Sequence, residues 1–494
     1  MTSPGPLNAV EITLASHTNV GKTTLLRTLL GKDVGEVCDE AHVTQFSERY
    51  IWLENAQGEA LKLWDTPGFG DSQRLEKRMR LSGTPLGWLL RQVWDRLRNP
   101  GFYYSQIALQ TVKDNADLVL YLVSAAELPA ADAAVLSEMR ILEWTGKPVI
   151  VLLNQLGEQR TLEQDAADIT AWTALLAPFN CVHTVLALDA FTRCWVQEFR
   201  LLEAIEQALQ LPSRQALLRR LAGELHARHL RVFRSATTAL ADCVAACALA
   251  RVAAGAPAGQ GRWRNYVARL LGRGPDLAAA GVALRTQARA ETAAAVAALV
   301  AAHGLDALIR NDIEAGLAAT PGTTARGGER LISALGPVAG GVVGGLLTDL
   351  MTGGLSLGLG ALLGGAAGLL GGRVAALEFN RISGSGGHWM EWSPAALEEL
   401  IAQLLMAYLV VAHAGRGRGP AMLEREQPRW RGLVPELLAA RCAELDALWA
   451  VRAEAVTDPA AQAGFRARLH ALCGELQWAA LLALYPDAAR LRAL

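Results

Sequence analysis

The stretch that most constrains this chain is Ser16–Thr24 (SHTNVGKTT), which separates an apolar run from a leucine-rich helical pattern. Small residues between a strand and a helix let backbone N–H groups point at an anion, and the helix N-terminus adds the positive end of its dipole. We therefore expect a phosphate-binding loop, although Ser16 stands where the motif G-x-x-x-x-G-K-[ST] has its first glycine. Lys22 should reach the β- and γ-phosphates, and the Thr23 hydroxyl should bind Mg²⁺. The loop residues expected to contact the nucleotide are Ser16, Asn19, Val20, Gly21, Lys22, Thr23 and Thr24.

A second predicted loop follows two strands. Residues 44–53 and 60–64 have the composition of strands and flank a turn-forming Asn-Ala-Gln-Gly sequence. The second strand leads directly into Asp65-Thr66-Pro67-Gly68. An aspartate at the end of a buried strand beside a phosphate loop can hold Mg²⁺ through a water, and the Gly68 N–H can meet a γ-phosphate. Thr44, at the start of the first of these strands, is the predicted second hydroxyl on Mg²⁺.

Continuous apolar runs predict the remaining strands of the N-terminal part. Residues 118–123 (LVLYLV) and 148–153 (PVIVLL) are two such runs, with a helical pattern over 131–144 between them. Residues 182–188 form the last predicted strand, and 195–209 form the closing helix. Continuous apolar strands separated by helices are typical of a mostly parallel sheet that is covered on both faces. The predicted fold class of this part is therefore an α/β phosphate-loop domain.

These motifs resemble those of the translation-factor-related GTPases close to Era and TrmE. The resemblance covers about residues 9–210 and is carried by Asn-Val-Gly-Lys-Thr at 19–23, Asp-Thr-Pro-Gly at 65–68 and Asn154 after a strand. It implies a P-loop GTPase that binds GTP or GDP with Mg²⁺. In that group an Asn-Lys-x-Asp motif reads guanine, whereas this chain has Asn154-Gln155-Leu156-Gly157. The guanine-reading carboxylate is absent, so Asn154 is the remaining candidate for contact with the base.

Two single positions bear on hydrolysis. Phe69 follows Gly68 where many small GTPases place a water-orienting glutamine, so another group must orient the water. In TrmE-like GTPases an asparagine at the position of Asn19 coordinates K⁺. The resemblance thus implies slow GTP hydrolysis that K⁺ stimulates and that pairing of GTPase domains in a homodimer accelerates; the alternative is that Asn19 only forms hydrogen bonds within the loop. The expected catalytic residues are Asn19, Lys22, Thr44 and Gly68.

Composition divides the 494 residues into four regions. The whole chain, with its NQLG sequence, Trp-rich insertion and Gly-rich C-terminal half, resembles a bacterial group of Era-like GTPases with a C-terminal domain of unknown function. The part that follows the GTPase domain is predicted to be all-α. The predicted regions are a GTPase domain over 1–211 with a helical insertion near 71–113, a basic Ala/Arg-rich helical region over 212–330, a glycine-rich apolar hairpin over 331–372 and a helical region over 373–494.

The glycine-rich hairpin is nearly uncharged, because Asp349 is its only charged residue. Glycine recurs every four residues from 336 to 344 and again from 360 to 372, so each set lies along one helix face that another helix can approach closely. Each arm of about 17 residues would span about 25 Å, slightly less than a ~30 Å hydrocarbon core. Three interpretations stay open: a membrane-inserting hairpin, a hairpin buried in a soluble helical domain, and an oligomerisation zipper.

Charge is placed unevenly although the net charge is −1. Residues 212–331 contain 16 Arg against 8 acidic residues, and 262–273 is a short basic segment with a Trp and a Tyr. Such a segment can lie in a lipid headgroup layer, which together with 331–372 predicts an anionic membrane surface as a partner; the alternative is a solvated helix face. Only the excess of Arg favours nucleic acid as a partner, because no RNA-reading module is recognisable.

The N-terminal residues 1–8 lack the pattern of a secretory leader, so we expect a cytoplasmic protein, peripheral to or inserted at the inner face of the cytoplasmic membrane. Seven scattered cysteines without metal-site spacing are expected to be buried thiols. Residues 393–412 predict a buried amphipathic helix with a Ser-Pro start.

Taken together, these patterns predict a GTP-binding and GTP-hydrolysing molecular switch coupled to a membrane-associating helical region. The alternative is a nucleotide-binding scaffold or membrane-remodelling protein with little hydrolysis or relaxed base specificity. The altered base motif and Phe69 support this alternative.

Overall fold

The computed structural model describes residues 8–17, 20–31, 48–69, 72–81, 100–124, 133–154, 162–188, 194–253, 275–304, 379–384, 387–413, 430, 432–488 and 491. The chain divides into two compact units, Met1–His229 with His413–Arg425 and Leu230–Ala412 with Glu426–Leu494. The hairpin predicted over 331–372 and the basic segment 262–273 lie outside the described residues.

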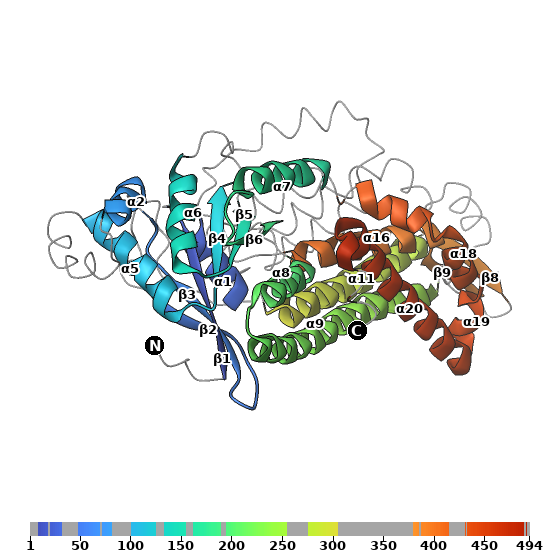
Figure 1. Cartoon of the computed structure of the whole chain (residues 1–494). Coiled ribbons are helices and arrows are strands. Elements are labelled where there is room, and N and C mark those ends of the chain that lie inside the picture. Colours follow the sequence, from blue (N-terminus) through green and yellow to red (C-terminus); the bar gives the residue numbers. More distant parts are fainter. Residues whose placement is uncertain are drawn as a thin grey trace, which may run out of the picture. The chain divides into compact units, whose positions relative to one another are not determined.

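A six-stranded sheet forms the centre of the first unit (Figure 1). Neighbouring strands are parallel except for β2 and β3, which are antiparallel. Strands that are apolar along their whole length favour such a sheet, because both of its faces are buried. The predicted α/β class is therefore confirmed. In spatial order the strands are β2 (Glu48–Glu54), β3 (Ala60–Asp65), β1 (Ala9–Ser16), β4 (Leu118–Ser124), β5 (Val149–Asn154) and β6 (Val182–Ala187).

Helices cover both faces of this sheet (Figure 1). In β4 the three leucines enter one hydrophobic cluster, and the residues between them enter the other, as the alternation of a strand requires. The first cluster is covered by α1 (Lys22–Leu30), α8 (Trp195–Ala208) and the start of α9 (Pro212–Leu249). The second cluster is covered by α5 (Pro100–Asn115), α6 (Ala133–Thr145) and α7 (Leu162–Leu176), and α2 (Ser72–Leu81) packs on α6.

The second unit is mainly helical, as predicted. Besides the later part of α9, its helices are α11 (Pro275–Ala302), α16 (Pro394–Ala412), a helix over residues 432–439, α18 (Cys442–Ala450), α19 (Arg452–Thr457), α20 (Pro459–Leu484) and the 3₁₀ turn η2 (Pro486–Ala488). Its core contains buried polar contacts as well as apolar side chains. The Thr237 hydroxyl on α9, for example, donates to Gln477 Oε1 on α20 at 2.6 Å.

A small antiparallel sheet corrects the expectation of purely α-helical structure after residue 211. Its strands are ordered β7 (Arg251–Ala253), β9 (Gly387–Trp392) and β8 (Phe379–Gly384). Residues 212–330 were predicted to be helical, but α9 ends at Leu249 and β7 follows it. Long-range pairing overrides the local helical pattern here, because Arg251 lies opposite Glu391 and its Nε donates to Glu391 Oε2 at 2.8 Å.

Two of the described helices, α9 and α16, are long and apolar enough to cross a membrane by length and composition. In their most apolar windows, 56% and 78% of the residues, respectively, are buried inside the structure. Core helices of soluble proteins have the same composition, so a buried position accounts for α16. The helix predicted over 393–412 is confirmed, and the Ser393 hydroxyl accepts from the Ala396 N–H at 3.1 Å at its start.

The side chain of Asn55 holds the turn between β2 and β3. Its Oδ1 accepts from the N–H groups of Gln57 at 3.1 Å and Glu59 at 2.9 Å. Gly58 has a φ of 76°, a left-handed conformation that glycine adopts without strain. The turn predicted from Asn-Ala-Gln-Gly is therefore confirmed.

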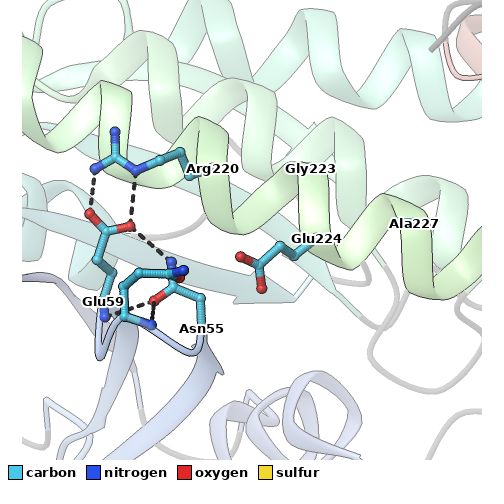
Figure 2. A pocket seen from close by; sticks show the side chains of 7 residues that line it. Asn55, Glu59, Arg220, Gly223, Glu224 and Ala227 are labelled. Atoms are coloured by element: carbon cyan, nitrogen blue, oxygen red, sulfur yellow. Dashed lines mark hydrogen bonds and ion pairs between the residues drawn. The ribbon is translucent and has the colours of Figure 1, made fainter.

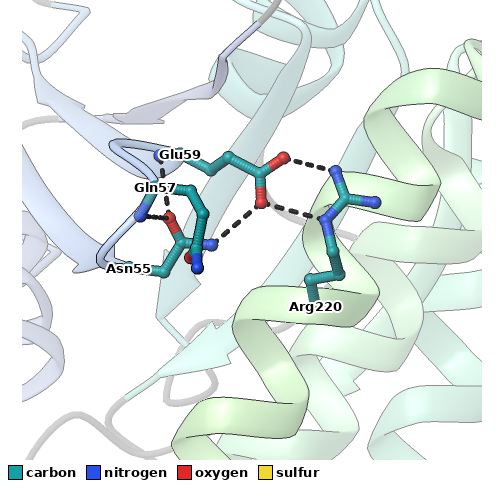
Figure 3. A network of polar contacts seen from close by, with 4 residues as sticks. All are labelled: Asn55, Gln57, Glu59 and Arg220. Carbon is teal, nitrogen blue, oxygen red and sulfur yellow. Dashed lines mark hydrogen bonds and ion pairs between the residues drawn. The ribbon is translucent and has the colours of Figure 1, made fainter.

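Arg220 on α9 contacts this turn through a bidentate ion pair with Glu59 (Figure 3). Its Nε donates to Glu59 Oε2 at 2.9 Å, and its Nη2 donates to Oε1. The Asn55 amide donates to Glu59 Oε2 at 2.9 Å. The hairpin that leads into Asp65 is thereby tied to α9 at its turn.

A pocket of about 540 Å³ lies beside this ion pair (Figure 2). On α9, the pocket is lined by Gly223 and Ala227, which have small side chains and lie one turn apart. The β2–β3 turn lines it with polar side chains. The lining residues are Asn55, Gln57, Glu59, Arg220, Gly223, Glu224 and Ala227.

We predict that Glu59 remains ionised to unusually low pH because of Arg220. The Arg220 guanidinium, with help from the Asn55 amide, lowers the pKa of Glu59 from 4.5 to about 2. A lowered carboxyl pKa stabilises the fold above the ordinary value, and this stabilisation is lost as the pH falls from 4.5 through about 2. A ¹³C titration of the Glu59 carboxyl should show this pKa in the wild type and a clearly higher pKa in Arg220→Gln, where only the Asn55 amide still lowers it. Equal pKa values in the two proteins would contradict the ion pair.

Candidate nucleotide-binding site

Three strands bring predicted site residues to one edge of the sheet. Ser16 ends β1, Asp65 ends β3 and Asn154 ends β5. Because these strands belong to the parallel part of the sheet, their carboxyl ends meet at the same edge. Ligands of open α/β sheets bind at this edge.

The end of the predicted phosphate loop has the backbone conformation that opens a helix. Gly21 has a φ of 95° and a ψ of 26° and lies directly before α1. A side chain there would be strained, and a Cβ atom would lie 2.7 Å from Asn154 Nδ2. The same Asn154 amide donates to the Val20 carbonyl at 2.7 Å. Asn154, predicted to contact the base, thus also fixes the loop from the end of a strand 134 residues away.

Ser16, which stands where the phosphate-loop motif has its first glycine, is buried and contacts Lys22. The Lys22 ammonium donates to Ser16 Oγ at 3.0 Å, and the Ser16 hydroxyl donates to the His17 carbonyl. Burial lowers the pKa of Lys22, while the negative charges of Asp65 and Glu138 oppose this shift. The loop therefore holds a desolvated cation whose energy an incoming anion would lower.

Asp65 and Thr23 meet beside this lysine. The Thr23 hydroxyl donates to Asp65 Oδ2 at 3.0 Å, whereas Asp65 Oδ1 is buried and has no hydrogen-bond partner in the described part of the chain. Burial raises the pKa of Asp65, opposed by Lys22 and by the Thr23 hydroxyl. Hydroxyl and carboxylate oxygens are the ligands that Mg²⁺ prefers, so this pair fits a divalent cation.

The loop after Asp65 runs back beside the phosphate loop. The Thr66 hydroxyl donates to the Leu14 carbonyl at 2.7 Å, and the Phe69 N–H donates to the Ser16 carbonyl at 3.0 Å. His17 and Phe69 also form an isolated parallel bridge. Gly68, the predicted contact to a γ-phosphate, therefore lies between two residues that are held in place, Thr66 by β1 and Phe69 by the phosphate loop.

Not every predicted site residue can be placed. Ser16, Val20, Gly21, Lys22, Thr23, Thr24, Asp65, Gly68 and Asn154 are described, and all but Gly21 and Thr23 are buried. Asn19 and Thr44, together with the residues that follow Asn154 in the altered base motif, lie outside the described residues. The roles predicted for Asn19 and Thr44 stay predictions.

The sequence did not reveal one polar group under the loop, Glu138 on α6. Its side chain is completely buried, yet Oε1 lies 2.8 Å from His17 Nδ1 and Oε2 accepts from the Tyr121 hydroxyl at 2.5 Å. A glutamate within the apolar positions of the helix predicted over 131–144 was the available signal. Such a residue is readily assigned to the solvent face until the fold shows its neighbours.

Metal-binding clusters of three or more His, Cys, Asp or Glu side chains are absent from the described residues. Cys194, Cys243, Cys247 and Cys473 are free and buried, which agrees with the prediction of buried thiols for these four, whereas Cys442 is exposed.

Comparisons with known proteins bear on this site. Residues 11–155 match the family of 50S ribosome-binding GTPases. No match to a curated protein was found.

Three solved structures illustrate the range of structural matches. A variant of Era from Aquifex aeolicus bound to GDP and aluminium fluoride is 18% identical with a TM-score of 0.30, covering 42% of this chain and 60% of that chain. Era in complex with MgGDPNP and a segment of 16S ribosomal RNA is 17% identical with a TM-score of 0.30, covering 47% of this chain and 67% of that one. A probable GTP-binding protein EngB is 19% identical with a TM-score of 0.27, covering 41% of this chain and 99% of that one.

The family match covers the phosphate loop, the Asp-Thr-Pro-Gly loop and Asn154, and the structure gathers all three at one sheet edge. The resemblance to P-loop GTPases predicted from the motifs is thus confirmed. The N-terminal part of this chain is a P-loop GTPase domain.

Proposed function

We propose that the chain is a molecular switch that binds GTP with Mg²⁺ and hydrolyses it slowly to GDP and phosphate. The observation that carries this proposal is the 3.0 Å hydrogen bond between the Thr23 hydroxyl and the buried Asp65 carboxylate, next to a desolvated Lys22. An unpartnered carboxylate oxygen and a buried ammonium group in one place are costly without ligands. A nucleotide triphosphate with a divalent cation supplies both missing partners.

Each of the site residues would have its own role in binding the nucleotide. Lys22 would exchange Ser16 Oγ for phosphate oxygens, and the N–H groups at the start of α1 would hold the β-phosphate. Mg²⁺, when bound, neutralises charge on the phosphates, and Thr23, Asp65 and Thr44 are the residues that would hold it. The Gly68 N–H would sense the γ-phosphate. Phe69 cannot orient water, so slow intrinsic turnover follows.

Nucleotide preference tests this proposal directly. We expect single-turnover hydrolysis of GTP, with ATP at least tenfold slower, and we expect Asp65→Asn to lower the rate by about a hundredfold because the carboxylate charge at the cation site is lost. Asp114→Asn, at an exposed position of α5, is the matched control and should hydrolyse GTP like the wild type. A strong preference for ATP, or unchanged hydrolysis in Asp65→Asn, would contradict the proposal.

K⁺ stimulation through Asn19 is a further part of the proposal, supported by the resemblance to TrmE-like GTPases. K⁺ bound by Asn19 would add positive charge near the transferred phosphoryl group, and pairing of two GTPase domains would shield that ion from water. We expect faster hydrolysis in KCl than in NaCl, an increase with protein concentration, and loss of the KCl effect in Asn19→Ala. The K⁺ role is wrong if the two salts give equal rates and the substitution changes neither.

Association of the C-terminal region with the inner face of the cytoplasmic membrane is supported by sequence alone. The basic segment 262–273 and the apolar residues 331–372 carry it. In flotation with vesicles that contain phosphatidylglycerol, we expect the wild type to rise with the lipid and a deletion of 331–372 to rise much less. Vesicles of phosphatidylcholine are the control for charge. A wild type that stays unbound with GTP and with GDP would assign 331–372 to soluble structure.

A further inference from the structure

Asp65 lies at one end of a strand whose other end is held by a helix. β3 runs from Ala60 to Asp65, and Glu59 directly precedes it in the β2–β3 turn. The six residues of this strand cover about 20 Å, so the turn and the candidate cation site lie at its opposite ends. Asp65 pairs with Glu48 at the start of β2, which makes the two strands one hairpin. A group that holds the turn therefore acts on the position of Asp65.

The hairpin forms one edge of the six-stranded sheet. β2 is the edge strand, and β3 pairs with β1 on its other side. The register of β2 on β3 also shifts between Ile51 and Leu53. Edge strands and irregular ladders have fewer backbone hydrogen bonds than central strands. The position of the hairpin therefore depends more on side-chain contacts than the position of the central strands does.

α9 bridges this hairpin and the centre of the sheet. Arg214 Nε lies 3.6 Å from Asp117 Oδ2, and the same oxygen accepts from the Glu11 N–H at 2.9 Å. Asp117 directly precedes β4, so this contact fixes α9 to the centre of the sheet. Further along α9, Arg220 binds Glu59 at the hairpin turn (Figure 3). A displacement of the hairpin relative to the centre of the sheet therefore acts on the pair of Arg220 and Glu59.

Apolar packing places the same helix over the strand that ends at Asp65. Leu217, Leu221 and Leu225 of α9 belong to the same buried cluster as Leu61 and Leu63 of β3. The three α9 leucines recur every four residues and so lie along one face of the helix. The leucines and the ion pair thus act on one hairpin from one helix.

Free space lies beside the turn. The pocket of about 540 Å³ borders the ion pair, and its wall on α9 includes Gly223 (Figure 2). A Cβ atom at Gly223 would meet no atom of the described chain within 4 Å. Glycine inside a helix lowers its stability relative to alanine, and packing within the described chain does not require it here. The turn therefore has room to shift beside α9, and the ion pair favours one position.

We propose that Arg220 is a positioning residue for the cation site: it fixes the hairpin through Glu59, and the hairpin places the Asp65 carboxylate. This inference rests on the proposed binding of GTP with Mg²⁺. Because coupling between two sites is reciprocal, a cation that fixes Asp65 also stabilises the turn against α9. Arg220 therefore strengthens nucleotide binding when a divalent cation is present and has little effect without one.

The Mg²⁺ dependence of GTPγS binding to the full-length chain tests the proposal. We expect Arg220→Gln to raise the Mg²⁺ concentration for half-maximal binding about three- to fivefold, since a partly exposed ion pair contributes no larger change. In EDTA, the affinity of this variant for GDP should stay within about twofold of the wild type, because the phosphate loop is unchanged. Fluorescent GTPγS and GDP analogues measure both quantities.

Glu59→Gln completes a double-mutant cycle with Arg220→Gln. The variant with both substitutions should lose no more than either single variant, because both remove the same contact. Arg219→Gln is the matched control, since Arg219 is the neighbouring residue of α9 and its Nε donates to Glu206 on α8 at 2.6 Å. This control should keep the Mg²⁺ dependence of the wild type.

Four outcomes would overturn the positioning role. They are an unchanged Mg²⁺ dependence in Arg220→Gln, additive effects of Glu59→Gln and Arg220→Gln, an equal effect of Arg219→Gln, and a loss of GDP affinity in EDTA in Arg220→Gln. A wild type that does not bind GTPγS, or binds it equally with and without Mg²⁺, would instead refute the proposed function.

Discussion

The site depends on two buried charges of opposite sign that the fold leaves incompletely paired. Burial shifts the pKa of Lys22 downward and that of Asp65 upward, so each group is disfavoured in its charged form. Lys22 has a neutral hydroxyl as its hydrogen-bond acceptor, and one Asp65 oxygen has no partner among the described residues. The free-energy cost of burying these two groups is part of folding and is not added when a ligand binds. The site is therefore preorganised for phosphate and a divalent cation.

The surrounding fold explains how the site can act on its neighbours. Asp65 ends the hairpin formed by β2 and β3, whose turn is fixed to α9 by the pair of Glu59 and Arg220. Phe69, directly after Gly68, is fixed to the phosphate loop through its backbone N–H, and Glu138 contacts His17 of that loop. The hairpin that leads into Asp65 and the loop that follows it are thus each attached to a neighbouring element. A change at the phosphate must be accommodated at these attachments.

Local signals were sufficient to predict the GTPase domain. The strand ends at Ser16, Asp65 and Asn154 follow from apolar runs that stop at polar residues, and parallel pairing then requires that they meet. The turn at Asn55 and the start of α16 at Ser393 also follow from local chemistry. Contacts between distant residues could not be predicted in this way.

Glu138 and the small sheet show why contacts between distant residues could not be predicted from local signals. Nothing near Glu138 in the sequence indicates that Tyr121 and His17 surround it, because their proximity arises from packing of α6 on the sheet. Similarly, β7 pairs with β9 through residues 140 positions apart, which overrides the helical tendency of an Ala-rich segment. Asn154 was predicted to contact the base, and only the fold shows that its amide also holds the Val20 carbonyl.

The central claim is that a triphosphate and its cation complete the charges of Lys22 and Asp65. A crystal structure of the full-length chain with Mg²⁺ and a non-hydrolysable GTP analogue tests it most directly. We expect Lys22 Nζ to leave Ser16 Oγ for the β- and γ-phosphates, and we expect the cation to lie between the Thr23 hydroxyl and the Asp65 carboxylate. A nucleotide bound elsewhere, or phosphates at this edge with Lys22 still on Ser16, would contradict the account.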